Sequence, residues 1–259
     1  SCLIILGTLI VNYCLNVTGV YDKYDRQIYD VYARKFRTNA QPNPNIKVVL
    51  IDDYSLNLYS DVLGRWPWPR AIYKDVINFI TLGEPKAIFF DILFSEEDII
   101  NQVDEVFAIA MNDTDNVHLG GLFTSEVYQK YSKKIPDNIR NKFSLNTDES
   151  INYLNINSFE NHYLPIPTLL AFSKSLPIVT FDADDDGIMR RSSVLFKYNN
   201  QYFPSLATSA LLAISESSNI SFNVQNKEIE IGDFDLPINE NGEIILNHYP
   251  QGFSPFSIS

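Results

Sequence analysis

Residues 47–53 read KVVLIDD and residues 87–91 read AIFFD. Each segment is a short, continuous apolar run that ends in acidic residues, which is typical of a strand buried on both faces of a sheet. The segment Arg70–Leu82 between them has the apolar spacing of a helix. A strand, a helix and a strand in this order form a β-α-β unit, whose right-handed crossover sets the two strands parallel. The sequence therefore predicts an α/β fold.

The acidic residues at the ends of these two strands form a first candidate ligand site. Asp52 and Asp53 follow the first strand, and Asp91 follows the second. Open α/β sheets usually bind ligands at the carboxyl ends of their strands. We therefore expect the three carboxylates to lie near one another, at the ends of adjacent strands. Acids in such positions also serve metal-dependent hydrolases, which is an alternative interpretation of the same residues.

The rest of the chain continues the alternation of strands and helices. We expect further helices at residues 101–112 and 203–215, and further strands at residues 117–122, 177–181, 228–231 and 243–247. The segment 124–160 is polar and rich in Asn, Lys and Ser, which predicts an exposed insertion with one helical turn. The predicted architecture is thus a mixed, largely parallel sheet flanked by helices.

The N-terminal part of the chain is first apolar and then amphipathic. The run Cys2–Leu15 is shorter than the roughly 20 residues that span a bilayer, and it lacks the basic start and the small residues of a signal peptide. We interpret residues 1–19 as the truncated end of a transmembrane helix; a buried helix or strand of a soluble core is the alternative. Residues 20–45 are predicted to form a long membrane-proximal amphipathic helix and a linker. One side of this helix carries Val20, Tyr24, Ile28, Val31 and Phe36, and it either docks onto the domain or forms a dimer seam.

The overall composition excludes several classes of partner. The chain has a formal net charge of −12, which disfavours binding to nucleic acid or to anionic lipid headgroups. Its two cysteines, Cys2 and Cys14, lie in the apolar N-terminal run, away from any Cys/His spacing typical of zinc. We therefore predict no structural metal, no disulfide framework and no cofactor.

The segment GRWPWPR, residues 64–70, is a second candidate site. The prolines bias Trp66 and Trp68 toward extended backbone, so the segment can hold both rings in fixed positions. Rigid aromatic rings suit a wall that recognises a ligand, and they suit a plug of the hydrophobic core equally well. Arg65 and Arg70 are candidate ion partners of Asp52 or Asp91.

The segment DADDDG, residues 182–187, resembles the opening of a calcium-binding loop. The bidentate Glu that closes such a loop is absent, because its position is Ser193. Arginines also follow the acids closely. We therefore favour an acidic hairpin turn in which Arg190 pairs internally over a calcium site.

Five segments together carry a resemblance to a known family. They are VVLIDD (48–53), GRWPWPR (64–70), KAIFFDILF (86–94), DDDGIMRR (184–191) and EIILNHY (243–249). In order and spacing they resemble the CHASE type-two sensor domain, and GRWPWPR followed by FDILF is the specific part. The resemblance implies that residues 46–259 are an extracytoplasmic sensor domain of a bacterial receptor, truncated at its C-terminus. It also implies a homodimer, flanking membrane helices and a cytoplasmic nucleotide cyclase, histidine kinase or serine/threonine kinase as output.

A ligand-sensing role, without enzymatic activity, is the function that the sequence favours. The histidines at 118, 162 and 248 lie in no recognisable nucleophile or zinc motif. The expected ligand is an unidentified small molecule or ion. Its candidate binding residues are Asp52, Asp53, Arg65, Trp66, Trp68, Arg70, Asp91, Asp186 and Arg190. The alternative is a structural or dimerisation module that acts through the helix at residues 20–36.

Overall fold

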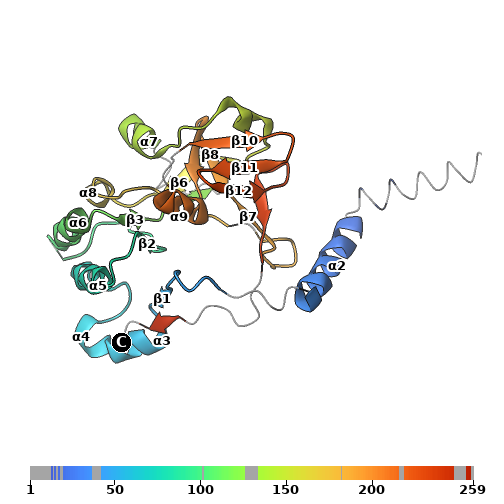
Figure 1. The fold of residues 1–259 in the computed structure, drawn as a ribbon. Coiled ribbons are helices and arrows are strands. Elements are labelled where there is room, and N and C mark those ends of the chain that lie inside the picture. Colours follow the sequence, from blue (N-terminus) through green and yellow to red (C-terminus); the bar gives the residue numbers. More distant parts are fainter. Residues whose placement is uncertain are drawn as a thin grey trace, which may run out of the picture. The chain divides into compact units, whose positions relative to one another are not determined.

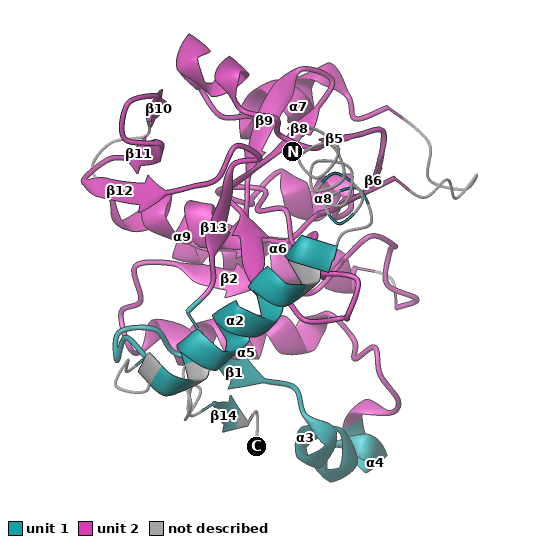
Figure 2. Ribbon diagram, turned by 90° about the vertical axis from the view of Figure 1, so that its right-hand side faces the viewer, with its two compact units in different colours: residues 1–62, 247–259 teal, residues 63–246 magenta. Residues whose placement is uncertain are grey.

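The computed structural model describes residues 13, 15, 17, 20–36, 42–100, 102–125, 134–181, 183–215, 219–247 and 255–257. These residues form two compact units, which Figure 2 distinguishes by colour: unit 1 comprises residues 1–62 and 247–259, and unit 2 comprises residues 63–246. Most of the apolar N-terminal run lies outside the described residues. Among the helices that are described, none combines the length and the apolar character needed to cross a membrane.

Unit 1 contains a helix, a short helical pair and one pair of strands. Its elements are α2 (Val20–Phe36), β1 (Val49–Leu50), α3 (Asp53–Leu58), α4 (Ser60–Leu63) and β14 (Phe256–Ser257). α2 lies within the segment 20–45, and β1 lies within the predicted run 47–51. A long membrane-proximal N-terminal helix stays a prediction. β1 pairs in parallel with β14, so that Val49 lies opposite Phe256. The first predicted strand therefore pairs with a segment near the end of the chain.

The first half of unit 2 has the predicted helix-strand alternation (Figure 1). It comprises α5 (Ala71–Thr81), β2 (Ile88–Phe90), α6 (Val103–Thr114) and β3 (Val117–Leu119). β2 and β3 are parallel, as the crossover through α6 requires. Four aromatic rings fill the space between these elements, with ring centroids 5.1 to 6.0 Å apart: Tyr73, Phe90, Phe94 and Phe107. This aromatic cluster is the core of the half.

Two glycines interrupt the strand that was predicted at residues 117–122. A Cβ on Gly120 would lie 3.1 Å from the carbonyl oxygen of Phe90, and one on Gly121 would lie 3.0 Å from a methyl group of Leu176. The absence of side chains lets the strand ladders approach closely here. After the glycines the chain continues as β4 (Leu122–Thr124). Gly121 bridges in parallel to Ile178, which bridges in parallel to Ser205.

The second half of unit 2 consists mostly of short strands. These are β5 (Ser158–Phe159), β6 (Asn161–Tyr163), β7 (Arg191–Ser193), β8 (Leu195–Tyr198), β9 (Gln201–Pro204), β10 (Ile220–Asn223), β11 (Glu228–Ile231), β12 (Phe234–Pro237) and β13 (Glu243–Ile245), with the helices α8 (Pro167–Leu170) and α9 (Leu206–Ile214). They pair as β5-β8-β9, β10-β11-β12, β13-β7 and β4-β6, in both parallel and antiparallel directions. The mixed α/β class is confirmed. One largely parallel sheet is not shown, because the described strands form several small sheets.

The segment predicted as an exposed insertion is more ordered than its composition indicates. Within its described part, residues 134–160, it forms α7 (Asp137–Phe143) and a 3-10 helix, η1 (Glu149–Tyr153). Ile135, Phe143 and Ile151 are buried. The prediction of an exposed segment was wrong here, because a few well-spaced apolar residues are enough to attach a mostly polar segment to the core.

Candidate functional site

The two tryptophans of GRWPWPR lie in different environments. Trp68 is buried, whereas Trp66 is 44% exposed, and the two rings meet edge to face with centroids 5.9 Å apart. Trp68 therefore serves as a plug of the core. Trp66 and the exposed Arg65 are accessible to solvent. Because both side chains are accessible, a role for Trp66 and Arg65 in recognising a ligand stays a prediction.

Arg70 is the centre of a buried polar network that joins two helices. Its Nη1 lies 2.6 Å from Oδ1 of Asp104, in the first turn of α6, and its backbone N–H donates to Asp98 Oδ2 at 2.8 Å. The guanidinium group also donates to the carbonyl of Glu96 and lies over the ring of Phe94. Arg70 does not pair with the expected partner Asp91, and a pairing with Asp52, which belongs to the other unit, stays a prediction. Asp104 takes that place because α5 and α6 pack against each other and bring their first turns together.

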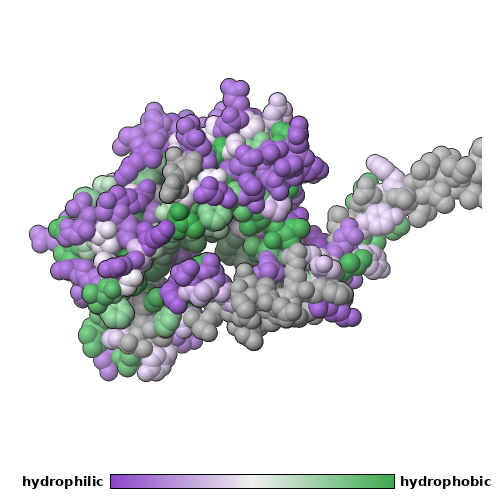
Figure 3. All heavy atoms as spheres, in the orientation of Figure 1, coloured by the Kyte–Doolittle hydropathy of each residue, from purple (hydrophilic) through white to green (hydrophobic). Residues whose placement is uncertain are grey.

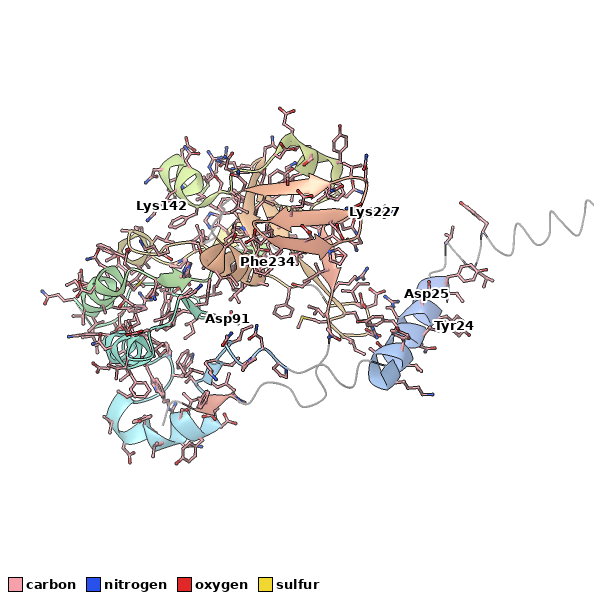
Figure 4. All side chains as sticks on the ribbon, viewed as in Figure 1. Tyr24, Asp25, Asp91, Lys142, Lys227 and Phe234 are labelled. Atoms are coloured by element: carbon pink, nitrogen blue, oxygen red, sulfur yellow. The ribbon has the colours of Figure 1, made fainter. Side chains whose placement is uncertain are left out.

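The three acids predicted at strand ends belong to different units. In unit 1, Oδ1 of Asp52 accepts hydrogen bonds from the N–H and the hydroxyl of Ser55, at 2.9 and 2.6 Å, and so caps α3. Asp53 is exposed in the first turn of the same helix. In unit 2, Asp91 is exposed after β2 (Figure 4). β1 pairs with β14 in unit 1 and β2 pairs with β3 in unit 2, so no described strand pair brings the acids of the two units together. A ligand site shared by these acids therefore stays a prediction. Within the described part of the chain, no group of three or more His, Cys, Asp or Glu side chains is arranged to hold a metal ion.

The acidic turn before β7 is closed by internal ion pairs, as predicted. Arg190 is 5% exposed, and its Nη1 lies 2.7 Å from Oδ2 of Asp184. The same guanidinium makes two hydrogen bonds to Asp186, both of 2.9 Å. The left-handed conformation of Gly187, with φ of 77°, lets the chain reverse between these groups. Asp182, the first acid of the calcium-like pattern, lies outside the described residues.

Asp184 is shared between two arginines. Its Oδ1 accepts a hydrogen bond of 2.5 Å from Nη2 of Arg191, while its Oδ2 faces Arg190. Burial alone would raise the pKa of the Asp184 carboxyl, but the hydrogen bonds from both arginines outweigh it, so the pKa lies below its usual value. The carboxylate is therefore charged at neutral pH and holds both arginines in place.

A cavity of about 150 Å³ lies beside this turn, and we refer to it as the β7–β13 cavity. Its polar wall includes Arg191, Ser193 and Glu243, and its apolar wall includes Phe181, Met189 and Leu246. The antiparallel pairing of β7 with β13 places Glu243 opposite Ser193, and Arg191 lies two residues before Ser193 on the same face. The two strands thus present groups of opposite charge and a hydroxyl to one space.

The comparison with protein-family models agrees with the resemblance that the sequence motifs carry. The family model described as the CHASE2 domain matches residues 4–259. The chain belongs to the CHASE2 family. CHASE2 domains are extracytoplasmic sensor domains, which is the role that the resemblance implied. Neither a curated protein nor a solved structure matches the chain.

In this CHASE2 domain, Arg191 and Glu243 are each held in position by a neighbouring side chain. A hydrogen bond to Asp184 raises the pKa of Arg191 and keeps its guanidinium charged. Glu243 Oε2 accepts a hydrogen bond of 2.8 Å from Nδ2 of Asn239. Nη1 of Arg191 lies 3.8 Å from the same Oε2. Both groups are therefore held near each other in defined positions at the edge of the cavity.

Sequence reasoning missed two residues of this CHASE2 cavity, Arg191 and Glu243. The alternation of residues along β7 gives a weak signal, because it predicts that Arg191 and Ser193 share a face. The pairing of β7 with β13, about fifty positions later, brings Glu243 to that face. Of the predicted candidates, Asp186 and Arg190 lie in the turn beside the cavity and support it.

Proposed function

We propose that this chain is the ligand-sensing domain of a bacterial membrane receptor, on the extracytoplasmic side. Its signal would pass across the membrane, through flanking helices, to a nucleotide cyclase, histidine kinase or serine/threonine kinase of the same receptor. The observation that supports this proposal is the CHASE2 match over residues 4–259. The role is binding and relay, not catalysis.

The β7–β13 cavity is the proposed ligand site. It combines an apolar wall with charged groups that are already held in place, which is typical of small-molecule sites. A ligand can shift a receptor only by binding one of its conformations better than the other. A shift in β13 could reach unit 1 along the polypeptide chain, because β13 ends at Ile245 and unit 2 ends at Leu246. Beyond that boundary, β14 pairs with β1, which follows α2 along the chain.

A thermal-shift screen of the 259-residue chain tests the sensing role. A compound that binds the native state must raise its apparent stability. We expect one class of small metabolite or ion to raise the melting temperature saturably, and Glu243→Gln to abolish that rise. Glu228→Gln, on β11, is the matched control and should keep it. A complete absence of shifts would contradict the sensing role, and shifts that Glu243→Gln leaves intact would contradict the assignment of the ligand site to the β7–β13 cavity.

The extracytoplasmic location needs a separate test. A β-lactamase reporter placed after Ser259 in the native receptor confers resistance only if that point of the chain is outside the cytoplasm. We expect resistance. Sensitive cells that contain the intact fusion would refute the proposed location.

A dimerisation role is the second candidate, and one feature of α2 together with Val17 before it favours this role. Large apolar side chains are exposed at a spacing of four, three, four and three residues: Val17, Tyr21, Tyr24, Ile28 and Val31. A heptad spacing of this kind lets two copies of a helix pack against each other. We propose a second copy of this chain as the partner.

The association state of the chain tests this candidate. Ile28→Asp should lower the dimer fraction measured by light scattering at least tenfold, whereas Gln27→Asp, at an exposed neighbouring position, should not. Equal effects of the two variants, or a monomer at all concentrations, would exclude the seam.

A further inference from the structure

Arg191 and Glu243 lie close to each other without forming a direct hydrogen bond. The 3.8 Å between Nη1 of Arg191 and Oε2 of Glu243 exceeds the 2.7–3.2 Å of an N–H···O hydrogen bond. Each group instead has a closer partner behind it, Asp184 for the arginine and Asn239 for the glutamate. The side chain of Arg191 remains 44% exposed and that of Glu243 remains 18% exposed. Both can therefore accept a further charged partner from the cavity.

The charges around the cavity select between classes of ligand. Arg190 and Arg191 face three carboxylates, those of Asp184, Asp186 and Glu243, so this cluster has a net charge of −1. A simple anion would pair with Arg191 but would be repelled by Glu243 at close range. A simple cation would pair with Glu243 but would be repelled by Arg191. A ligand with one charge of each sign satisfies both residues.

The size and the apolar wall of the cavity limit the ligand further. The cavity measures about 150 Å³ and is partly open to solvent, so it can hold a small metabolite or one end of a longer ligand. Phe181, Met189 and Leu246 offer an apolar surface next to the charged pair. A short apolar side chain on the ligand would cover part of this surface, in which Phe181 and Met189 are exposed to solvent.

We propose that the β7–β13 cavity binds a small zwitterion of the α-amino acid type. The ligand carboxylate pairs with the Arg191 guanidinium, the ligand ammonium pairs with the Glu243 carboxylate, and an apolar side chain packs against Met189 and Leu246. Ser193, which lies opposite Glu243 on the strand pair, adds a hydroxyl to the lining of the cavity. The proposal rests on the sensing role above and names the ligand class of that same site.

Calorimetric titration of the 259-residue chain with matched compounds tests the ligand class. L-Valine carries both charges, isobutylamine is valine without the carboxylate, and isovalerate is valine without the ammonium. We first screen the twenty common L-amino acids and expect at least one to bind saturably. Valine should bind at least tenfold more tightly than either analogue.

Variants at the two charged residues assign the contacts. Arg191→Gln and Glu243→Gln should each weaken amino-acid binding at least tenfold. Glu243→Gln should leave the weak affinity for isovalerate unchanged or improve it, because it removes the like charge. Glu228→Gln is again the control. Circular dichroism melting of each variant verifies that it is folded.

Four results would overturn the proposal. Isobutylamine or isovalerate binding as tightly as valine would indicate a site for a single charge. Amino-acid binding that survives both substitutions in folded protein would place the site elsewhere. If no amino acid binds but another compound in the thermal-shift screen does, the ligand class is wrong while the sensing role stands. If no compound of any class shifts the melting temperature, the sensing role itself fails.

Discussion

Lowering the pH should destabilise unit 2 through one buried histidine, His118. The ring is 8% exposed on β3, stacks on Phe89 with centroids 4.3 Å apart, and has its Nδ1 2.7 Å from the hydroxyl of Ser175. Burial, with a further contribution from the nearby Lys174 charge, lowers the pKa of His118 to about 4. The unfolded chain keeps an ordinary histidine pKa near 6.5.

The sign and size of the effect follow from these two pKa values. Below about pH 6.5 the unfolded state binds a proton that the folded state does not bind until about pH 4. The free energy of unfolding therefore falls as the pH drops through this window. Between pH 7 and pH 5 the loss from His118 is about 2 kcal/mol.

Guanidinium denaturation at pH 7, 6 and 5 measures this loss. Both tryptophans, Trp66 and Trp68, lie in unit 2, so their fluorescence reports the unfolding of that unit. His118→Gln removes the titrating group, and the difference between wild type and variant isolates it from His162 and the carboxylates. The variant should lose about 2 kcal/mol less than the wild type from pH 7 to pH 5. Parallel losses in the two proteins would refute the assignment.

Three further predictions concern single residues, and denaturant midpoints check the first two. Arg70→Met should cost roughly 3–5 kcal/mol, because it leaves the buried carboxylate of Asp104 unpaired, and Arg70→Met/Asp104→Leu should recover most of it. Phe107→Ala should cost about 3–5 kcal/mol, whereas Ile109→Ala, 60% exposed on the same helix, should cost less than about 0.5 kcal/mol. Asp91→Ala should leave both the fold and the ligand-induced thermal shift intact, because Asp91 does not line the β7–β13 cavity; loss of the shift in the folded variant would instead support the strand-end site.

The sequence was most informative where structure is local. The spacing of apolar residues over Arg70–Leu82 predicted α5 to within one residue at each end, and the run at 87–90 predicted β2. The internal pairing of Arg190 was also predictable, because the acids of its own turn are its nearest possible partners.

Contacts between distant segments could not be predicted in this way. The partner of β1 is β14, about 200 residues later, and no local pattern encodes that pairing. Arg70 finds Asp104 only because α5 and α6 pack side by side. The β7–β13 cavity depends equally on a pairing of distant strands. These contacts depend on the tertiary structure, which the spacing of apolar residues does not determine by itself.

Unit 2 also has apolar surface that its core does not use. Figure 3 shows apolar residues at the surface over α5, where Phe79 and Leu82 are 76% and 81% exposed. Periodicity predicted a helix with one apolar face here, and the buried face contains Tyr73 and Ile77. Burial in the core of unit 2 therefore does not explain why Phe79 and Leu82 are apolar.

The sharing of Asp184 between Arg190 and Arg191 bears on how the ligand proposed for the β7–β13 cavity could change among related CHASE2 domains. This carboxylate is 6% exposed, so replacing Arg191 would remove one of its two counter-ions inside the protein. A mutation that changes the ligand through Arg191 would therefore also weaken the fold. Replacing Glu243 would not leave a buried charge without a counter-ion, because Asn239, the side chain that donates a hydrogen bond to it, is neutral. Selection for new ligands would consequently act first on the β13 side of the cavity, while the arginine side stays constant.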